Sequence, residues 1–403
     1  MFNVNAPCAP FVFFRSYSHN NDGIRETWKE VCDRTIAGLK KLGKLTEEET
    51  AFLWEQQYNF KCLSSGRWLW VGGREWIEKP ENFPGAYNCT SLKLTSLKIF
   101  GLLMDLGMQG CGTGAVLTED YISQLPSVSN KLKIEFVSEV GTCPTSDRRE
   151  KTKVEVDPTS ISHLITIRVG DSREGWVAAY QELLNLAFDS LFTQSSPIKV
   201  TIDLSSVRPA GEKLQGFGGI SNPVKLPELF NKCAGILNGA IGRKLNSVEC
   251  SLLIDEAAIV IVAGNVRRTA GIRQFDHDDT IGASSKDNLW GQDAEGNWSI
   301  DPKRDALRMA NHSLVFKHKP TLEECKASVA KQYLSGEGAI QWGGEAVARC
   351  NVDLLTAPTL KTSFLNAYNR GDARRWLQDH YPAMPVKELD HRLSRLGLNP
   401  CGK

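Results

Sequence analysis

Residues 110–117 read GCGTGAVL, and they follow a segment from residue 97 that we expect to be helical. Glycine has no Cβ, so Gly110, Gly112 and Gly114 allow close backbone approach or positive φ angles within this stretch. A glycine cluster of this kind does not identify a fold by itself. Its meaning depends on the segments that precede and follow it in the chain.

Two helices and a turn-rich stretch are expected upstream of the glycine cluster. Apolar residues recur at helical spacing within residues 22–63, and Thr46 with Glu49 three residues later is typical of a helix start. Residues 64–92 mix short aromatic strands with glycine, proline and asparagine turns, as loops at the mouth of a barrel do. We therefore expect ligand contacts there.

Downstream, strands and helices alternate with two unusual loops. Residues 124–200 contain alternating strand-like segments and an amphipathic helix from Trp176, which indicates an inserted α/β unit. Residues 201–222 run from a strand into a basic, glycine-rich loop that suits a phosphate, and a helix is expected from about Leu226. A second helix ends in an arginine-containing turn at 264–271.

Length, charge and cysteine content restrict the class of protein. The chain has 403 residues, enough for an enclosed core, and its 48 Lys and Arg against 47 Asp and Glu indicate neither a nucleic-acid nor a membrane partner. The sequence lacks a long apolar run and a signal-peptide pattern, which favours a cytoplasmic location. The 11 cysteines show no CxxC spacing, so we expect buried thiols and no metal site.

The last residues of the sequence include Asn399, Pro400, Cys401 and Gly402, which read NPCG. They resemble the signature that ribonucleotide reductases place at the tip of a loop inside their barrel. The pattern of that family is also met upstream, in the same order, by SSGRWLWVGG (64–73), YNC (87–89), GCGTG (110–114), VRPAG (207–211), GFGG (216–219) and GNVRRTAG (264–271). Because these segments span nearly the entire chain, the resemblance is strong.

The long segment between GCGTG and VRPAG, with SREGWV at 172–177, resembles the insertion of monomeric vitamin B12-dependent (class II) triphosphate reductases. In that branch the insertion stands in for a second subunit, so the resemblance implies an allosteric site within one chain and a monomer when complete. The implied fold is α/β: the ten-stranded α/β barrel of ribonucleotide reductases and glycyl radical enzymes. Here it would comprise the first half-barrel and the start of the second, with N-terminal helices and an α/β insertion.

These implications divide the chain into four expected parts. Residues 1–63 form an N-terminal helical region, and residues 64–123 start the catalytic barrel. Residues 124–200 form the inserted allosteric unit that mimics a dimer partner. Residues 201–403 continue the barrel as far as the radical-cysteine loop.

The resemblance implies thioredoxin-dependent reduction of ribonucleoside triphosphates to 2′-deoxyribonucleoside triphosphates for DNA synthesis. Hydroxide is a poor leaving group at an unactivated carbon, so the family first forms a radical at C3′ of the ribose. Adenosylcobalamin supplies this radical, which reaches Cys401 as a thiyl that removes the 3′ hydrogen. Cys89 matches the cysteine that donates a proton and then an electron, ending in a redox-active disulfide whose partner lies beyond Cys401. A buried structural thiol is the alternative for either cysteine.

The resemblance also assigns residues to substrate binding. Asn88 and Asn399 match residues that hydrogen-bond the ribose hydroxyls, since an amide offers both donor and acceptor, although either could hold a turn. Ser64 and Ser65 align with residues that meet the base or the phosphates, although serine before glycine is also ordinary turn chemistry. Gly112, within the glycine cluster, is expected to lie at the substrate.

A deoxynucleotide effector and its specificity loops are assigned in the same way to Arg208, Gly216, Gly218, Gly219, Asn222, Asn265, Arg267 and Arg268. Arginine stacks on bases and forms paired hydrogen bonds with phosphates, although a solvated arginine pair is ordinary. Asp171 and Arg173 either cap the helix at Trp176 or contact the effector ribose. Cys111 and the seven scattered histidines receive no role from the sequence.

The sequence departs from the family pattern at Lys403, where the signature has glutamate, the general base for the 3′-hydroxyl. The partner of Cys89, the rear of the barrel, much of the cobalamin surface and the cysteine pair that thioredoxin recharges are also missing. We therefore expect the chain to be inactive alone and to need a C-terminal half. A broken gene, a frameshift, an intein or a split gene would each explain this end.

Two other functions stay open. A non-catalytic nucleotide-binding remnant would use the loops 207–222 and 264–271 without Cys401. A reductase of another class would draw its radical from a tyrosyl or glycyl group and ignore adenosylcobalamin. The residues also fit diphosphate substrates.

Overall fold

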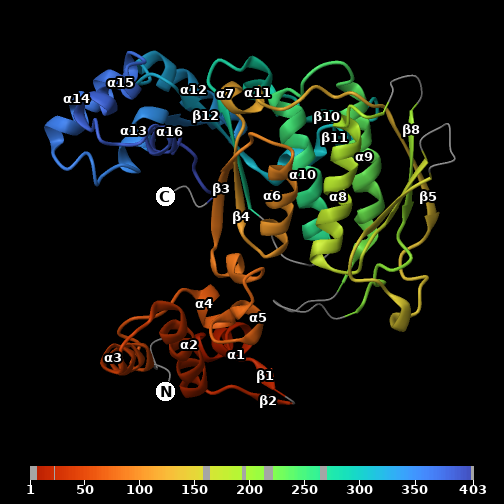
Figure 1. The fold of residues 1–403 in the computed structure, drawn as a ribbon, viewed down its shortest axis with the longest axis horizontal. Helices are drawn as coiled ribbons and strands as arrows, with labels where there is room; N and C mark the ends of the chain where they lie inside the picture. Colours follow the sequence, from red (N-terminus) through yellow and green to blue (C-terminus); the bar gives the residue numbers. More distant parts are fainter. Residues whose placement is uncertain are drawn as a thin grey trace. The chain divides into compact units, whose positions relative to one another are not determined.

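The structure is a computed structural model, and it describes residues 7–21, 23–157, 164–192, 197–212, 221–263 and 270–400 (Figure 1). These residues form two compact units, the first extending to Asn88 and the second beginning at Cys89. Among them, no helix combines the length and the apolar character needed to cross a membrane.

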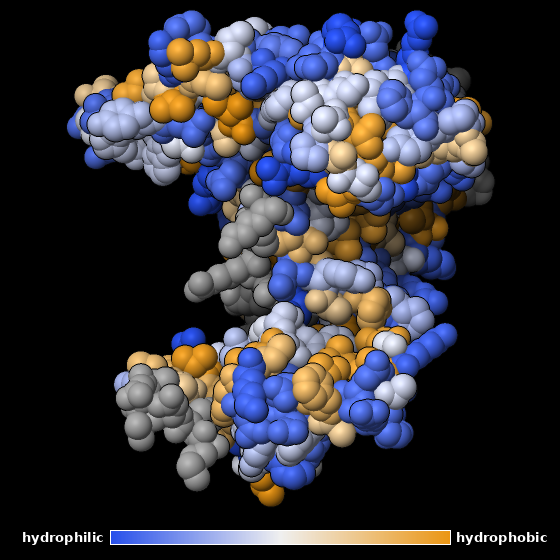
Figure 2. Space-filling model, turned by 90° about the vertical axis from the view of Figure 1, so that its left-hand side faces the viewer, coloured by the Kyte–Doolittle hydropathy of each residue, from blue (hydrophilic) through white to orange (hydrophobic). Residues whose placement is uncertain are grey.

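The N-terminal unit is mainly helical. Its elements are α1 (Ala9–Ser16), β1 (Asn20–Asn21), β2 (Ile24–Arg25), α2 (Trp28–Gly43), α3 (Glu47–Tyr58), α4 (Gly66–Val71), α5 (Glu75–Glu78) and η1 (Phe83–Ala86). The Thr46 hydroxyl and the Glu49 carboxylate form a capping box at the start of α3, which confirms the predicted helix start. Phe13, Trp28 and Leu69 pack in its core, and Figure 2 shows orange apolar areas among blue ones on its surface, in the lower part of the view.

Residues 64–88 differ from the expectation of short aromatic strands. The Ser65 hydroxyl accepts a hydrogen bond from the backbone N–H of Trp68 at 3.2 Å, so this stretch begins a helix, α4, instead. The Trp68 indole then donates to the backbone carbonyl of Thr35 at 3.0 Å, which joins α4 to α2. Residues 64–88 consequently belong to the same compact unit as the N-terminal helices, whereas the sequence placed the start of the barrel at residue 64.

The second unit is built on a parallel sheet of five strands. The strands are β3 (Cys89–Lys93), β4 (Gly112–Val116), β9 (Gly271–Asp276), β12 (Asn311–Phe316) and β13 (Ala339–Trp342). Their order is β13-β12-β9-β4-β3, and every neighbouring pair is parallel. Two helices, α6 (Lys98–Met108) and α10 (Ser247–Ala263), pack on each other and share one large apolar core with the sheet. The predicted α/β class is confirmed.

A second sheet lies between β4 and β9 in the sequence. It contains β5 (Leu132–Ser138), β6 (Lys153–Val156), β7 (Leu164–Arg168) and β8 (Ile198–Asp203), in the order β5-β8-β7-β6, with only the β6–β7 pair antiparallel. Helices α8 (Arg173–Phe188) and α9 (Leu226–Gly239) accompany it, and Figure 1 shows them between the two sheets. Helix α8 begins three residues before the expected Trp176, because Ser172 caps it.

The remaining elements complete the second unit. They are α7 (Glu119–Ile122), η2 (Thr145–Asp147), η3 (Pro223–Lys225), α11 (Thr280–Ser284), β10 (Trp290–Gln292), β11 (Trp298–Ile300), η4 (Asp305–Met309), α12 (Leu322–Ser335), α13 (Gly343–Arg349), α14 (Pro358–Asn369), α15 (Ala373–His380) and α16 (Val386–Leu393). The last four helices form their own apolar core around Phe364, Trp376 and Leu377. After α16 the chain returns to the parallel sheet.

A fully buried ion pair joins α10 to the central strand β9. Arg273 donates to the Asp255 carboxylate at 2.6 Å and to the Thr113 carbonyl of β4 at 2.7 Å. The hydroxyl of Ser251 donates to the second carboxylate oxygen at 2.9 Å. Burial raises the pKa of the Asp255 carboxyl, against the opposing effect of the Arg273 charge. The guanidinium therefore depends on one carboxylate for its charge compensation.

We expect Asp255→Asn to lower the free energy of unfolding by about 3–5 kcal/mol, because it leaves the Arg273 charge buried without a counter-charge. Urea unfolding followed by circular dichroism measures this change. The matched control is Asp379→Asn, which removes an exposed partner of Arg375 and should change stability by less than about 0.5 kcal/mol. Equal effects of the two substitutions would contradict this account of the buried pair.

Candidate functional site

Cys89 and Gly112 lie side by side at the start of the two strands β3 and β4. They are partners in the parallel register, and the Cys89 side chain is half-buried. Gly110 adopts φ +79° where α6 ends, and the backbone N–H of Cys111 donates to the Leu106 carbonyl at 2.9 Å. The positive φ expected within the glycine cluster therefore occurs at Gly110.

The segment that follows α16, here called loop 394–400, crosses β4 directly over the other two glycines. A Cβ at Gly114 would lie 2.4 Å from the Leu398 carbonyl oxygen, and a Cβ at Gly112 would lie 3.1 Å from Pro400 Cγ. The same Gly112 position is 3.3 Å from Cys89 Sγ. The expected close backbone approach is confirmed, and the turn at Asn399 and Pro400 lies beside the Cys89 thiol.

Two buried glutamines bind the backbone of this loop. The Leu398 N–H donates to Gln274 Oε1 on β9 at 2.8 Å, and Gln341 Nε2 on β13 donates to the Leu396 carbonyl. Gln274 Nε2 in turn donates to Gln341 Oε1. An amide both donates and accepts, so this pair can satisfy an N–H and a C=O of the crossing chain together. Sequence reasoning missed both residues, although a glutamine inside a buried parallel strand is an available signal.

Residues of the edge strand β3 contact the first part of loop 394–400. Lys93 Nζ donates to the Ser394 hydroxyl at 2.6 Å, and burial lowers the pKa of this lysine. A Cβ at Gly397 would lie 2.3 Å from Ser91 Oγ, so the chain also passes closely over β3. Loop 394–400 is thus attached to β3, β9 and β13 and fits against β4. This arrangement holds a thiol at a fixed position relative to an asparagine-proline turn.

In the N-terminal unit, the residues expected at the substrate have local partners. The Ser64 hydroxyl donates to Gln57 Oε1 at 2.7 Å, and Ser65 caps α4. Asn88 Oδ1 accepts from Arg67 Nε at 2.8 Å. The Ser65 bond is the local turn chemistry that was its alternative, whereas Ser64 and Asn88 bond other side chains, and a substrate role remains a prediction for all three.

In the second unit, two residues expected at the effector are brought together. The backbone N–H and Nε of Arg208 donate to Asp171 Oδ1 at 3.0 and 2.9 Å. Arg173 instead forms an ion pair with Asp105, at 3.0 Å. Neither Asp171 nor Arg173 caps α8, because Ser172 does so by accepting from the Gly175 N–H.

Two further residues from the sequence analysis, Asn222 and Cys111, lie within the described part of the chain. Asn222 directly precedes η3 and makes no side-chain cap bond there, and Cys111 is buried. The remaining predicted site residues lie outside the described residues: Cys401, Gly216, Gly218, Gly219, Asn265, Arg267 and Arg268.

We expect Gly114→Ala to displace loop 394–400, because the new methyl group would meet the Leu398 and Thr90 carbonyl oxygens at 2.4 and 2.9 Å. Hydrogen exchange of the Leu398 amide should accelerate at least about tenfold, which corresponds to about 1.4 kcal/mol. The control is Gly235→Ala in α9, where nothing lies within 4 Å and alanine favours the helix. Unchanged Leu398 exchange in the Gly114 variant would refute the close crossing.

We expect Gln274→Met, which keeps the side-chain length but removes the amide, to leave the Leu398 N–H without its acceptor. The lost bond should cost about 1–3 kcal/mol and make Cys89 react faster with an alkylating reagent, as followed by peptide mass spectrometry. Gln124→Met serves as the control, since the Gln124 amide donates only to an exposed carbonyl near α7. Equal Cys89 alkylation in all three proteins would show that Gln274 does not hold the loop.

Comparison with known proteins gives matches to a family model, to protein sequences and to a solved structure. Residues 141–237 match the family model described as "B12-dependent ribonucleotide reductase, insertion domain". This range overlaps the predicted insertion at 124–200 and continues through most of α9. Two similar curated proteins are adenosylcobalamin-dependent ribonucleoside-triphosphate reductases, from Lactobacillus helveticus (strain DPC 4571) and Lactobacillus acidophilus (strain ATCC 700396 / NCK56 / N2 / NCFM). Both are 28% identical, over 61% and 63% of this chain respectively.

These matches cover 38% and 39% of the two relatives, so this chain spans less than two fifths of their length. A solved structure entitled "Crystal structure of B-12 dependent (class II) ribonucleotide reductase" is 22% identical, with a TM-score of 0.65. That match covers 82% of this chain and 48% of the other. The chain is therefore similar to B12-dependent ribonucleotide reductases in sequence, its residues 141–237 match the model of their insertion domain, and its fold resembles that of the solved class II enzyme.

Proposed function

We propose that this chain is the part of an adenosylcobalamin-dependent ribonucleoside-triphosphate reductase that carries the insertion domain and the active-site loop. The observation that carries the proposal is the position of the Asn399–Pro400 turn beside Cys89 Sγ. Pro400 and the sulfur both lie next to Gly112, which has no Cβ. The names of the relatives supply the reaction. Ribonucleoside triphosphates are accordingly the proposed substrates.

The proposed chemistry uses a sulfur on each side of the ribose. Cys401 follows Pro400 in the sequence, and as a thiyl it would take the 3′ hydrogen and later return it. Cys89 would give a proton to the departing 2′-hydroxyl, which leaves as water. Two electrons come from Cys89 and a second thiol outside this chain, which together become a disulfide. A thioredoxin-type reductant would reduce that disulfide after each turnover.

Asn399 would hydrogen-bond the ribose hydroxyls, since it lies between two residues whose positions are held by sheet contacts. Leu398 is bound by Gln274, and Pro400 packs at Gly112. Backbone contacts on both sides fix the point from which the Asn399 side chain extends, which contributes to positioning a substrate. The proposed complete fold is the ten-stranded α/β barrel, with the five parallel strands described above as its first half.

Adenosylcobalamin, when bound, would supply the radical that reaches Cys401. Its site has to open onto loop 394–400, which leads to that cysteine. The described cavity of ≈ 530 Å³ along α14 does not meet this requirement, because its lining consists of Pro358, Thr359, Thr362, Ser363, Asn366 and Arg370. We therefore assign no described side chain to the cofactor.

The insertion is the proposed site of the deoxynucleotide effector, with Asp171 and Arg208 held together at its edge. An arginine already paired with a carboxylate offers its remaining N–H groups in a fixed direction. The loops that contain Gly216, Asn265 and Arg267 are proposed to complete the effector site. Because the insertion would replace a second subunit, the complete enzyme is proposed to be a cytoplasmic monomer.

The test is complementation, because the chain spans less than two fifths of its relatives. The chain is co-expressed with the remaining part of such a reductase, and reduction of ribonucleoside triphosphates is assayed with and without adenosylcobalamin. We expect cobalamin-dependent reduction that falls to background in Cys401→Ser and Cys89→Ser, while deoxynucleotide binding persists. Cys350→Ser, at an exposed thiol, is the control and should retain activity.

Each other outcome has a defined meaning. Reduction that survives Cys401→Ser would overturn the proposed radical site. Reduction that ignores adenosylcobalamin would indicate another radical class. Deoxynucleotide binding without reduction in any mixture would favour a nucleotide-binding remnant.

A further inference from the structure

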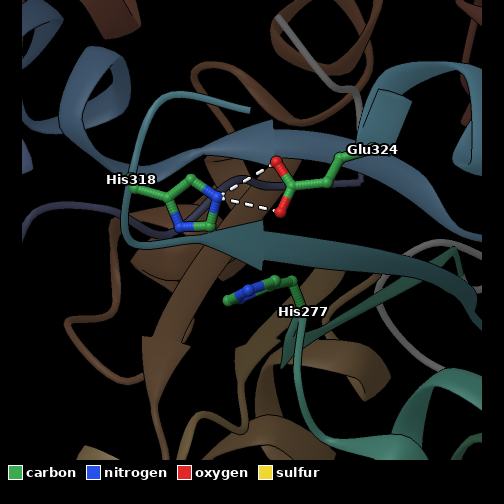
Figure 3. Close-up of side chains that lie close together, drawn as sticks. All are labelled: His277, His318 and Glu324. Atoms are coloured by element: carbon green, nitrogen blue, oxygen red, sulfur yellow. Dashed lines mark hydrogen bonds and ion pairs between the residues drawn. The ribbon is translucent and has the colours of Figure 1, made fainter. Parts of the chain in front are cut away.

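Three side chains with metal-binding atoms meet at the carboxyl ends of two neighbouring strands (Figure 3). His277 directly follows β9, His318 follows β12, and Glu324 lies in the first turn of α12. Because β9 and β12 are parallel neighbours, their ends lie at the same edge of the sheet. One ligand atom from each residue lies within 4.8 Å of the others.

His318 and Glu324 already have the spacing of two ligands on one ion. His318 Nε2 is 3.0 and 3.1 Å from the two carboxylate oxygens of Glu324. Two atoms bound at about 2.1 Å to the same Zn²⁺ are about 3.0–3.4 Å apart for angles between about 90° and 110°. A cation can therefore replace the proton between this imidazole and this carboxylate without a change in their separation.

His277 faces this pair from a rigid position. Its backbone N–H donates to the Val315 carbonyl of β12 at 3.0 Å, which continues the strand ladder. Its ring packs on Phe316, with centroids 4.6 Å apart, and meets the His318 ring edge-on at 5.0 Å. Its Nδ1 is buried, makes no hydrogen bond within the described part of the chain, and lies 3.9 Å from the Asp278 carboxylate. A buried imidazole nitrogen without a hydrogen bond is a polar group that a ligand can satisfy.

The two lysines that flank His318 in the sequence have their own partners. Lys317 lies next to His318 in the sequence, but its ammonium pairs with Asp120 at 3.0 Å and with Asp276 at 3.3 Å. Glu324 accepts hydrogen bonds from the backbone N–H of Thr321 at 2.7 Å and from His318 at 3.0 Å. On the other side of His318 in the sequence, the ammonium of Lys319 lies over the Trp342 ring, 6.0 Å from its centroid. One carboxylate and two imidazoles therefore lie close together, and the lysine that precedes His318 is paired with two carboxylates.

We propose that His277, His318 and Glu324 form a binding site for a divalent transition-metal ion, with Zn²⁺ as the best fit to two imidazoles and a carboxylate. This donor set is one that zinc uses with a fourth position left for water. The ion joins the ends of β9 and β12 to α12. It is a site that the sequence did not predict, and it is independent of the proposed reductase activity.

The probe is Zn²⁺ titrated into the full chain by isothermal calorimetry. We expect one site, and at least about tenfold weaker binding in His318→Ala and in His277→Ala. Glu324→Gln should weaken binding similarly while keeping the α12 capping box, because glutamine also serves at that position. His391→Ala, at an exposed histidine on α16, is the matched control and should bind Zn²⁺ as the unmodified chain does.

X-ray absorption at the zinc edge separates this site from binding by the cysteines. Ligands at about 2.0–2.1 Å indicate nitrogen and oxygen, whereas about 2.3 Å indicates sulfur. Nitrogen and oxygen ligands that vanish in His277→Ala support the site. Sulfur-only coordination, affinity equal in all variants, or no measurable Zn²⁺ binding by the folded chain would each overturn it. Circular dichroism of every variant confirms that lost binding is not lost folding.

Discussion

The hydrogen bond between the Leu398 backbone and the buried Gln274 amide is the constraint on which the rest of the site depends. A backbone that lies on a sheet needs partners for its N–H and C=O groups, because water does not reach them there. Gln274 and Gln341 supply those partners, and Gly114 supplies the space for the crossing. Pro400 consequently packs at Gly112. A Cβ at Gly112 would lie 3.1 Å from Pro400 Cγ and 3.3 Å from Cys89 Sγ.

Strand β9 connects this loop to the insertion. Successive residues of a strand point to opposite faces, so Arg273 faces α10 while Gln274 faces loop 394–400. The second sheet and helices α8 and α9 lie in the sequence between β4 and β9, and α10 leads back toward β9. The Asp255–Arg273 ion pair therefore links α10 to a strand that also holds the loop.

Part of this arrangement follows from the sequence. The glycines at 110, 112 and 114 predicted positive φ or close approach, and both occur: Gly110 has φ +79°, and a Cβ at Gly114 would lie 2.4 Å from the Leu398 carbonyl oxygen. The helix start at Thr46 was also predicted, since capping is local. Residues 64–92 were expected to mix short aromatic strands with turns, but residues 66–71 form α4, because Ser65 caps a helix whose tryptophan bonds to α2. The glutamine pair and the His277–His318–Glu324 cluster depend on strand order, which single-sequence patterns do not provide.

The central claim is that the Asn399–Pro400 turn rests on Gly112 beside Cys89, and nuclear Overhauser spectroscopy of the selectively labelled chain tests it most directly. We predict a cross-peak between the Gly112 Hα protons and the Pro400 ring, since a Cβ at Gly112 would lie 3.1 Å from Pro400 Cγ. An assigned Pro400 ring with cross-peaks only to residues outside β3 and β4 would contradict it.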